Sequence, residues 1–227
     1  MFRIAVSYAG AIRRKLMKNL LANFKKSNFK YLNVDEDDDS SVLFTKEDGI
    51  SLIPDENSTF YCDPNVKKNR SNAVFMYAEL EGDFIVRAHV DHDFIYTGDA
   101  ASIMMRVDDE NWAKLGFEKS ETGTHSLISS ITHDGWSDRA IGETYQWNNV
   151  RLYFVRKGNT FGMYYSADDK HKRLVRYFRF NAPEKIQVGM MAQSPNGEGD
   201  AVMNFYTFEV EHISVESIEA GALDDYS

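Results

Sequence analysis

Alternation of apolar and polar residues with a period of two is the feature that most constrains how this chain can fold. Several segments place an apolar residue at every second position, so each segment has one apolar face and one polar face. This pattern is typical of half-buried β-strands, in which successive side chains point to opposite faces. The segments are DFIVRAHVD (83–91), SIMMRVD (102–108), NVRLYFVRKG (149–158), TFGMYYS (160–166) and IQVGMMAQ (186–193).

Turn-forming residues separate these segments, and none of the stretches between them has a helical period. The turn signals are Gly98-Asp99, Gly123, Gly158-Asn159, Asp168-Asp169 and Asn196-Gly197. Strands joined by short turns favour antiparallel sheets. The sequence therefore predicts an all-β protein: a jelly-roll β-sandwich of two antiparallel sheets with about a dozen strands. At 227 residues the chain suits one such domain with a single core.

The N-terminal part differs in both charge and periodicity. Apolar residues recur every four positions from Ala11 to Lys26, which predicts a short amphipathic helix with a basic face. Residues 1–34 contain eight Lys and Arg and no acidic residue, whereas the rest of the chain has 18 basic against 35 acidic residues, a net charge of −17. Three hypotheses stay open: a docked helix, an organelle-targeting segment, or a helix that binds a membrane surface or a partner.

Charge and cysteine content also limit the partners and the compartment. A strongly acidic body repels phosphate backbones, so we expect no nucleic-acid binding. No apolar run approaches the ~20 residues of a transmembrane helix. Cys62 is the only cysteine, which excludes an intramolecular disulfide and favours a reducing compartment. We expect a cytoplasmic protein, with organelle targeting through the basic N-terminus as the alternative, and leave its oligomeric state open.

The expected organisation is one domain with two extensions. Residues 1–27 form the basic amphipathic segment, residues 28–215 the sandwich, and residues 216–227 a short acidic tail. The acidic run DEDDD (35–39) is interpreted as a solvated linker, because it lacks the glycine and the order of oxygen ligands of a calcium loop.

The strand NWAKLGFE (111–118) carries the predicted binding site. Alternation places Ala113, Leu115 and Phe117 on the core face, and Trp112, Lys114, Gly116 and Glu118 on the other face. An exposed Trp beside a Lys and a Glu suits a ligand with both an apolar face and hydrogen-bonding groups, such as a sugar. We expect Trp136 and Asp138 to reach this site from a neighbouring loop, and Arg176 to extend its charged side.

Catalysis, metals and cofactors are less well supported. Glu118 and Asp138 are the one carboxylate pair that could serve a glycoside hydrolase, and that reaction stays as an alternative. The sequence has no HExxH, no thiolate cluster, no GxGxxG and no GxxxxGK[ST]. We therefore nominate no catalytic residue, no metal ligand and no cofactor, although a structural calcium ion stays open. A non-catalytic binding module is the leading hypothesis.

Four blocks in a fixed order resemble the DUF1349 family, a group of concanavalin A-like domains. They are NWAKLGFE (111–118), HDGWSD (133–138), RLYFVRKGNTFGMYYSADD (151–169) and VGMMAQSPNGEGDAVMNFYTF (188–208). The resemblance covers roughly residues 28–215 and implies the concanavalin A-like lectin and glucanase sandwich. That fold also bears on the enzyme alternative, because glucanases of this type carry an ExDxxE strand. The nearest match here is Glu198-Gly199-Asp200, in which Met203 stands at the position of the third carboxylate.

The resemblance also assigns positions within the motifs. The family's W-x-K-x-G-x-E strand falls on Trp112, Lys114, Gly116 and Glu118, its Ser-Asp pair on Ser137 and Asp138, and its SPxGxG turn on Ser194, Pro195, Gly197 and Gly199.

The family resemblance implies less about function. One fungal branch is named for regulating the glycolytic enzyme enolase, so the alternative to sugar binding is a regulatory protein–protein interaction with a metabolic enzyme. This chain departs from the family pattern at two places. Arg139 stands where an aromatic residue commonly follows the Ser-Asp pair, and a basic run through Arg173 replaces the usual Gly and Trp after Tyr165-Ser166.

Overall fold

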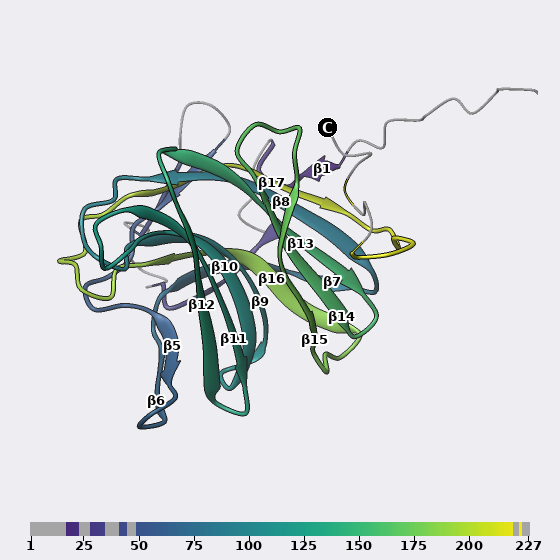
Figure 1. The fold of residues 1–227 in the computed structure, drawn as a ribbon, viewed down its shortest axis with the longest axis horizontal. Helices are drawn as coiled ribbons and strands as arrows, with labels where there is room; N and C mark the ends of the chain where they lie inside the picture. Colours follow the sequence, from purple (N-terminus) through teal and green to yellow (C-terminus); the bar gives the residue numbers. More distant parts are fainter. Residues whose placement is uncertain (1–16, 23–27, 35–40, 45–48, 220–222, 224–227) are drawn as a thin grey trace, which may run out of the picture.

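The computed structural model describes residues 17–22, 28–34, 41–44, 49–219 and 223. Two antiparallel sheets pack face to face, and the described residues contain no α-helix (Figure 1). The predicted all-β sandwich is therefore confirmed. The described residues form 17 strands rather than about a dozen, because several short strands near the N-terminus had no detectable alternation.

Seven strands of the eight-stranded sheet lie side by side, and the eighth, β1 (Lys18–Asn19), pairs with β17. In order they are β15 (Arg173–Arg179), β14 (Thr160–Ser166), β13 (Asn149–Lys157), β8 (Phe84–His92), β17 (Met203–Glu211), β4 (Ile50–Leu52) and β3 (Val42–Phe44).

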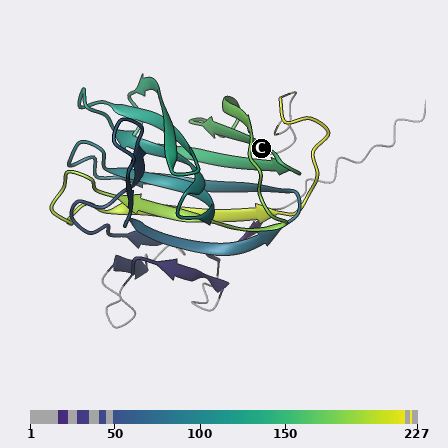
Figure 2. The same ribbon diagram turned by 90° about the horizontal axis from the view of Figure 1, so that it is seen from below.

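The seven-stranded sheet consists of β12 (Trp136–Tyr145), β11 (His125–His133), β10 (Asn111–Lys119), β9 (Ala100–Asp108), β16 (Lys185–Gln193), β7 (Val74–Glu81) and β2 (Lys30–Leu32). A separate hairpin is formed by β5 (Phe60–Asp63) and β6 (Lys68–Ser71). The short purple strands of the N-terminal region gather along one side of the sandwich in Figure 2, which agrees with the edge positions of β2 and β3.

The main core lies between the two sheets and comes from the alternating apolar residues. In β10, Ala113, Leu115 and Phe117 are fully buried in it, as predicted. The inward residues of β8 and β13, such as Val86 and Phe154, meet them from the other sheet. Burial of large apolar side chains contributes about 1.5–3 kcal/mol each, so the pattern that identifies the strands also holds the sheets together.

Each sheet also has a second apolar layer on its outer face. The β5–β6 hairpin places Phe60 against Phe75 and Trp112 of the seven-stranded sheet. The segment after β17 places Ile218 against Tyr164 of the eight-stranded sheet. Ile218 and Leu223 of the predicted acidic tail are buried there together with Val215, so these residues of the tail pack on the sandwich.

The predicted N-terminal helix is not formed in the part of it that the structure describes. Lys18 and Asn19 pair with Val210 and Glu209 of β17, and Leu21 is buried in the core. The β4 strand pairs β17 only as far as Phe205, so β1 supplies hydrogen bonds to the later part of β17. Tertiary pairing thus overrides the local helical period. Residues 11–16 and 23–26 of the predicted helix lie outside the described residues.

Within the described residues, no helix has the length and apolar content needed to cross a membrane.

Candidate functional site

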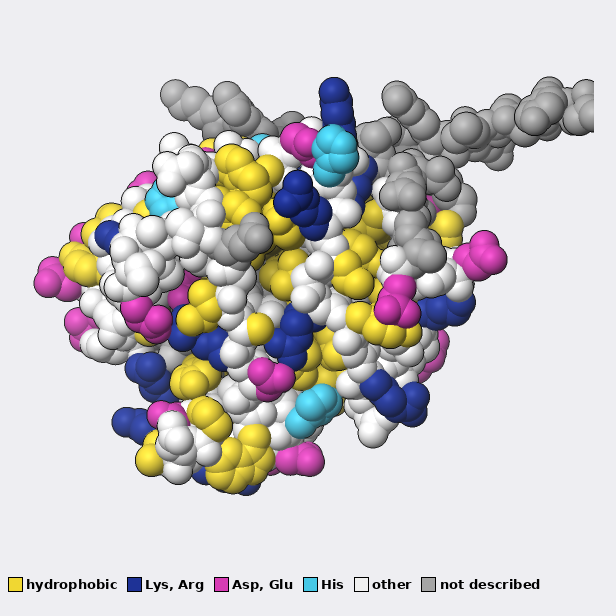
Figure 3. Space-filling model, in the orientation of Figure 1, with side chains coloured by type: hydrophobic (Ala, Val, Ile, Leu, Met, Phe, Trp, Pro, Cys, Tyr) yellow, Lys and Arg dark blue, Asp and Glu magenta, His cyan; other side chains and the backbone are white. Residues whose placement is uncertain are grey.

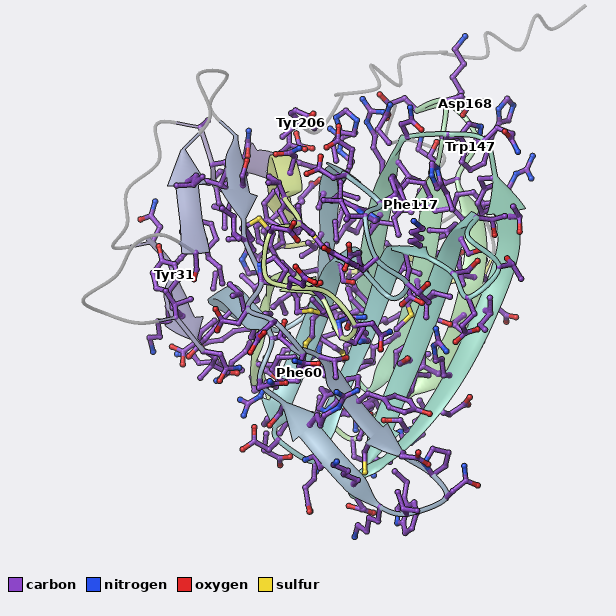
Figure 4. The ribbon with its side chains drawn as sticks, turned by 90° about the vertical axis from the view of Figure 1, so that its left-hand side faces the viewer. Tyr31, Phe60, Phe117, Trp147, Asp168 and Tyr206 are labelled. Atoms are coloured by element: carbon purple, nitrogen blue, oxygen red, sulfur yellow. The ribbon has the colours of Figure 1, made fainter. Side chains whose placement is uncertain are left out.

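A pocket of about 330 Å³ opens on the outer face of the seven-stranded sheet, beside the β5–β6 hairpin. The hairpin covers the Trp112 end of β10 and leaves the Lys114–Glu118 end accessible (Figure 4, where Phe60 marks the hairpin). We call this cavity the Lys114 pocket. Its polar wall is formed by Lys114, Glu118, Ser130, Arg139 and Gln193.

Lys114 is buried at the base of the pocket and holds the hairpin. Its Nζ donates hydrogen bonds to the Phe60 carbonyl oxygen at 2.7 Å and to Gln193 Oε1 at 2.6 Å. Gln193 is fixed in turn, because its Nε2 donates to the Gly98 carbonyl oxygen and its Oε1 also accepts from Thr59 Oγ1. The ammonium position is therefore set by acceptors on two separate segments, one of which, Gln193, is itself held by Gly98 and Thr59.

Glu118 lies two strand positions beyond Lys114 on the same face and is paired with an arginine. Arg139 of β12 donates from Nη2 to Glu118 Oε1 at 2.6 Å and from Nη1 to Glu121 Oε1 at 3.2 Å. The Glu118 side chain is only 5% exposed, whereas that of Glu121 is 64% exposed. The Glu118–Arg139 pair is therefore the desolvated one, and its geometry is fixed more strongly.

Burial changes the acid–base properties of both groups at the base of the pocket. Desolvation lowers the pKa of Lys114 to about 7, with Glu118 opposing the shift and Arg139 and Arg70 adding to it. Desolvation raises the pKa of Glu118, and Arg139 and Lys114 oppose that shift. Burial therefore disfavours the charged form of both side chains, and hydrogen bonds to Phe60, Gln193 and Arg139 oppose this by holding them in place.

Other groups make the pocket suitable for a ligand with mixed character. The Ser130 hydroxyl is buried and has no hydrogen-bond partner among the described residues. Tyr61 from the hairpin and Pro195 from the 194–199 turn supply apolar wall. Between Lys114 and Glu118, Gly116 leaves room for the Ser102 side chain of β9, because a Cβ at Gly116 would lie 2.3 Å from Ser102 Oγ.

The prediction that Trp112 is exposed for ligand stacking is wrong. Its side chain is fully buried in the cluster under the hairpin, with Phe60 edge-on at a centroid distance of 6.0 Å. The face assignment was right, since Trp112 and Lys114 do share the outer face. Sequence alternation gives the face of a strand but does not show which segment packs over it.

Three other predicted site residues do not meet Lys114 and Glu118. Asp138 pairs in register with Ile131, which pairs with the core residue Ala113, so Asp138 projects from the opposite face of the sheet. Its Oδ2 accepts a hydrogen bond from Arg176 Nη2 of β15 at 2.8 Å. Trp136 is 45% exposed under Lys67 and does not line the pocket.

The convergence of Trp136, Asp138 and Arg176 on this pocket is therefore wrong. The error lay in which alternate residues of β12 were assigned to the outer face of the sheet. Ser137 and Arg139, rather than Trp136 and Asp138, face the outer side with Lys114. Arg139 was visible in the sequence as the departure from the aromatic pattern after Ser-Asp. Tyr61 and Gln193 gave no such signal.

The positions of Glu118 and Asp138 favour ligand binding over glycoside hydrolysis by this pair of carboxylates. Glu118 and Asp138 lie on opposite faces of one sheet and each is bound by an arginine, so they do not act on a shared substrate. Within the described residues no group of three or more His, Cys, Asp or Glu side chains is placed to hold a metal ion.

Known proteins with similar sequences or structures support the β-sandwich fold described above. "Regulation of enolase protein 1" of Saccharomyces cerevisiae (strain ATCC 204508 / S288c) is 28% identical over 163 residues, which are 69% of this chain and 79% of the yeast protein. A crystal structure described as a functionally unknown protein from Saccharomyces cerevisiae superposes with a TM-score of 0.72 at 26% identity, covering 82% of this chain and 97% of that one.

A carbohydrate-binding module, CBM66 from Bacillus subtilis, shares the jelly-roll fold with a TM-score of 0.53 at 16% identity, covering 82% of this chain and 96% of that module. The sequence model of the family described as "Protein of unknown function (DUF1349)" matches residues 37–213. The chain therefore belongs to the DUF1349 family.

Proposed function

We propose that this protein is a non-catalytic binding module whose Lys114 pocket recognises a carbohydrate-like ligand. Lys114 donates to ligand oxygens, Glu118 accepts from ligand hydroxyls, and Arg139 fixes the Glu118 carboxylate. The ring face of the sugar packs on Tyr61, which takes the role first expected of Trp112.

The observation that carries the proposal is a set of buried polar groups beside an open cavity. A buried hydroxyl without a hydrogen-bond partner costs roughly 1–3 kcal/mol, and burying Lys114 and Glu118 is costly as well. Ser130 Oγ has no such partner among the described residues, yet it lines the same cavity as both charged side chains. A ligand rich in hydroxyl groups offsets these costs when it binds, whereas an apolar ligand does not.

The size of the cavity agrees with this ligand class. Ligand pockets commonly range from about 300 to 1,000 Å³. At about 330 Å³ the Lys114 pocket has room for one or two sugar rings at most. We therefore expect recognition of a terminal sugar unit rather than of a long internal stretch of polysaccharide.

A glycan-array screen followed by calorimetric titration of the best glycan tests this function. Glu118→Gln removes the acceptor charge at nearly constant volume and Tyr61→Ala removes the aromatic wall, so each lowers affinity by about tenfold or more. Tyr177→Ala is the matched control, because Tyr177 is 50% exposed on β15 and lies outside the pocket.

Two results would count against the proposal. Binding that both pocket variants retain at full strength would place the ligand elsewhere on the molecule. Mass-spectrometric detection of a cleaved glycan after incubation would replace the non-catalytic module with an enzyme.

The second candidate function is regulation of a metabolic enzyme through direct contact. It is favoured by the similarity to the yeast protein named for regulation of enolase, which extends over most of both chains. Purified enolase, mixed with this protein, then co-elutes in size-exclusion chromatography or changes its turnover rate in a concentration-dependent way. Separate elution together with unchanged enolase kinetics would remove this candidate.

A further inference from the structure

A groove lies at the side of the sandwich where β12 and β15 form the edges of the two sheets, and we call it the edge groove. It comprises two cavities of about 220 and 320 Å³, both lined by Tyr165 and Arg173. In Figure 3 the surface between these strands carries hydrophobic side chains with basic and histidine side chains beside them. The edge groove shares no lining residue with the Lys114 pocket.

Aromatic side chains form one wall of the edge groove. Tyr145 and Trp147 stack face to face at a centroid distance of 4.1 Å, and the Tyr145 hydroxyl donates to the Tyr165 hydroxyl at 2.9 Å. The Trp147 carbonyl oxygen is 2.7 Å from His125 Nδ1, which fixes the loop between β12 and β13. Trp147 lines the smaller cavity and is only partly buried. The wall is therefore pre-organised and accessible.

Basic side chains line the edge groove beside the aromatic wall, since Arg173 of β15 is the register partner of Tyr165 of β14, and Asp168 lines the smaller cavity with them. Arg173 is exposed, lines both cavities, and makes no ion pair or side-chain hydrogen bond with another described residue. His171 lines the smaller cavity, and Asp168 fixes its ring with a 2.6 Å contact from Oδ2 to Nδ1 (Figure 4 labels Asp168 and Trp147 in this region). These residues belong to the basic run Lys170–Arg173, which stands out in a chain body of net charge −17.

We propose that the edge groove is a second binding site, for a sugar ring that carries a phosphate or carboxylate group. The ring packs on the Trp147–Tyr165 wall, and the anionic group accepts hydrogen bonds from Arg173 with His171 beside it. An arginine fork matches a planar or tetrahedral oxyanion in two-point contact. An aromatic face suits the apolar face of a sugar ring.

Both halves of this ligand are needed to explain the groove. A bare anion would use Arg173 but would leave the adjacent aromatic wall in water. An uncharged sugar would cover the wall but would not pair the guanidinium. One ligand can contact both groups, since Tyr165 and Arg173 are neighbours on adjacent strands and line the same two cavities.

Titration calorimetry at low ionic strength tests the proposal with four probes: glucose 6-phosphate, glucuronate, glucose and inorganic phosphate. We expect at least one anionic sugar to bind about tenfold or more tightly than both glucose and inorganic phosphate. Arg173→Gln is expected to weaken that binding by about 10- to 100-fold, the usual effect of losing a charge-assisted hydrogen bond. Arg173 is exposed, so the variant is expected to fold.

Arg179→Gln is the matched control, because Arg179 is an exposed arginine on the same strand that lines neither cavity. The indole N–H resonance of Trp147 reports the location, and it is expected to shift with the anionic sugar while that of buried Trp112 stays in place. A preference for the phosphate or the carboxylate probe identifies the anionic group.

Three results would overturn the edge-groove site. They are no binding by either anionic sugar, equal binding by Arg173→Gln, or no anionic sugar that binds more tightly than both inorganic phosphate and glucose.

Discussion

The two outer faces of this sandwich are covered in similar ways, but the polar groups beneath the two covers have different surroundings. The β5–β6 hairpin covers the seven-stranded sheet, and the segment after β17 covers the eight-stranded sheet. In each case one side chain of the sheet donates to a backbone carbonyl of its cover: Lys114 to Phe60, and the Tyr164 hydroxyl to Ile218. The same structural device therefore uses a charged group on one face and a neutral hydroxyl on the other.

The difference lies in what surrounds each donor. On the eight-stranded sheet the nearby charges pair with each other, as Arg87 does with Glu209. On the seven-stranded sheet the cover stops short, and Lys114, Glu118 and the unpartnered Ser130 hydroxyl line an open cavity. The two faces therefore differ in that only the seven-stranded one is shown here with charged side chains beside an open cavity, where they can contact a ligand.

Removing the largest side chain under the hairpin should have the largest effect on stability among the changes considered for the two faces. Trp112→Ala is expected to lower the free energy of unfolding by about 3–5 kcal/mol, because the side chain is fully buried and leaves a cavity. Urea denaturation measures this change. A loss below about 1 kcal/mol would show that the hairpin packs without the indole, contrary to the structure.

The corresponding change on the other face should cost less. Ile218→Ala is expected to lower the free energy of unfolding by about 2–3 kcal/mol, at the lower end for this substitution, because its segment forms no strand. Hydrogen exchange should show faster exchange in residues 212–219 and unchanged protection of β5. If β5 lost protection as well, the two covers would not be independent.

Because Lys114 is a buried charged donor, its contribution to the stability of the protein should depend on pH. The pKa of Lys114 is lowered from 10.5 to about 7 by burial, so between these values the unfolded chain binds more protons than the folded one. The Lys114 contribution to stability is therefore least favourable below pH 7 and improves as pH rises toward 10.5. Unfolding of wild type and Lys114→Met, compared at pH 6, 7, 8 and 9, measures it.

We expect the free energy of unfolding of the wild type to increase relative to that of Lys114→Met as the pH rises. A constant offset between the two proteins is also expected, because the variant leaves the Phe60 carbonyl and Gln193 without their donor. An offset that does not vary with pH would mean that Lys114 titrates normally.

The smallest effect is expected at the pair that bridges β12 and β15. Asp138 is 69% exposed and Arg176 20% exposed, so Asp138→Asn should change the free energy of unfolding by less than about 1 kcal/mol. It should also leave glycan binding in the Lys114 pocket unchanged. Reduced glycan affinity in this variant would return Asp138 to the binding site.

Much of the fold could be read from individual residues, and much of the site could not. The alternation in 111–118 correctly separated Leu115 from Lys114, and the turn signal at Gly98 marks a real left-handed turn with φ of 91°. The pattern could not show that Phe60, over fifty residues away, covers Trp112. Nor could it place Asp138 on the correct face, because one position along β12 reverses the direction of every side chain.

What the sequence alone determined is therefore local: which segments are strands, and which residues within a strand share a face. These follow from backbone geometry and from the tendency of apolar side chains to leave water, both of which act over a few residues. Only the tertiary structure decided which outer face is covered, which charges are paired and where a cavity remains. These depend on packing between segments distant in sequence. The free energy of the buried Lys114 and Glu118 is likewise set by the distant hairpin and by Arg139 rather than by their own strand.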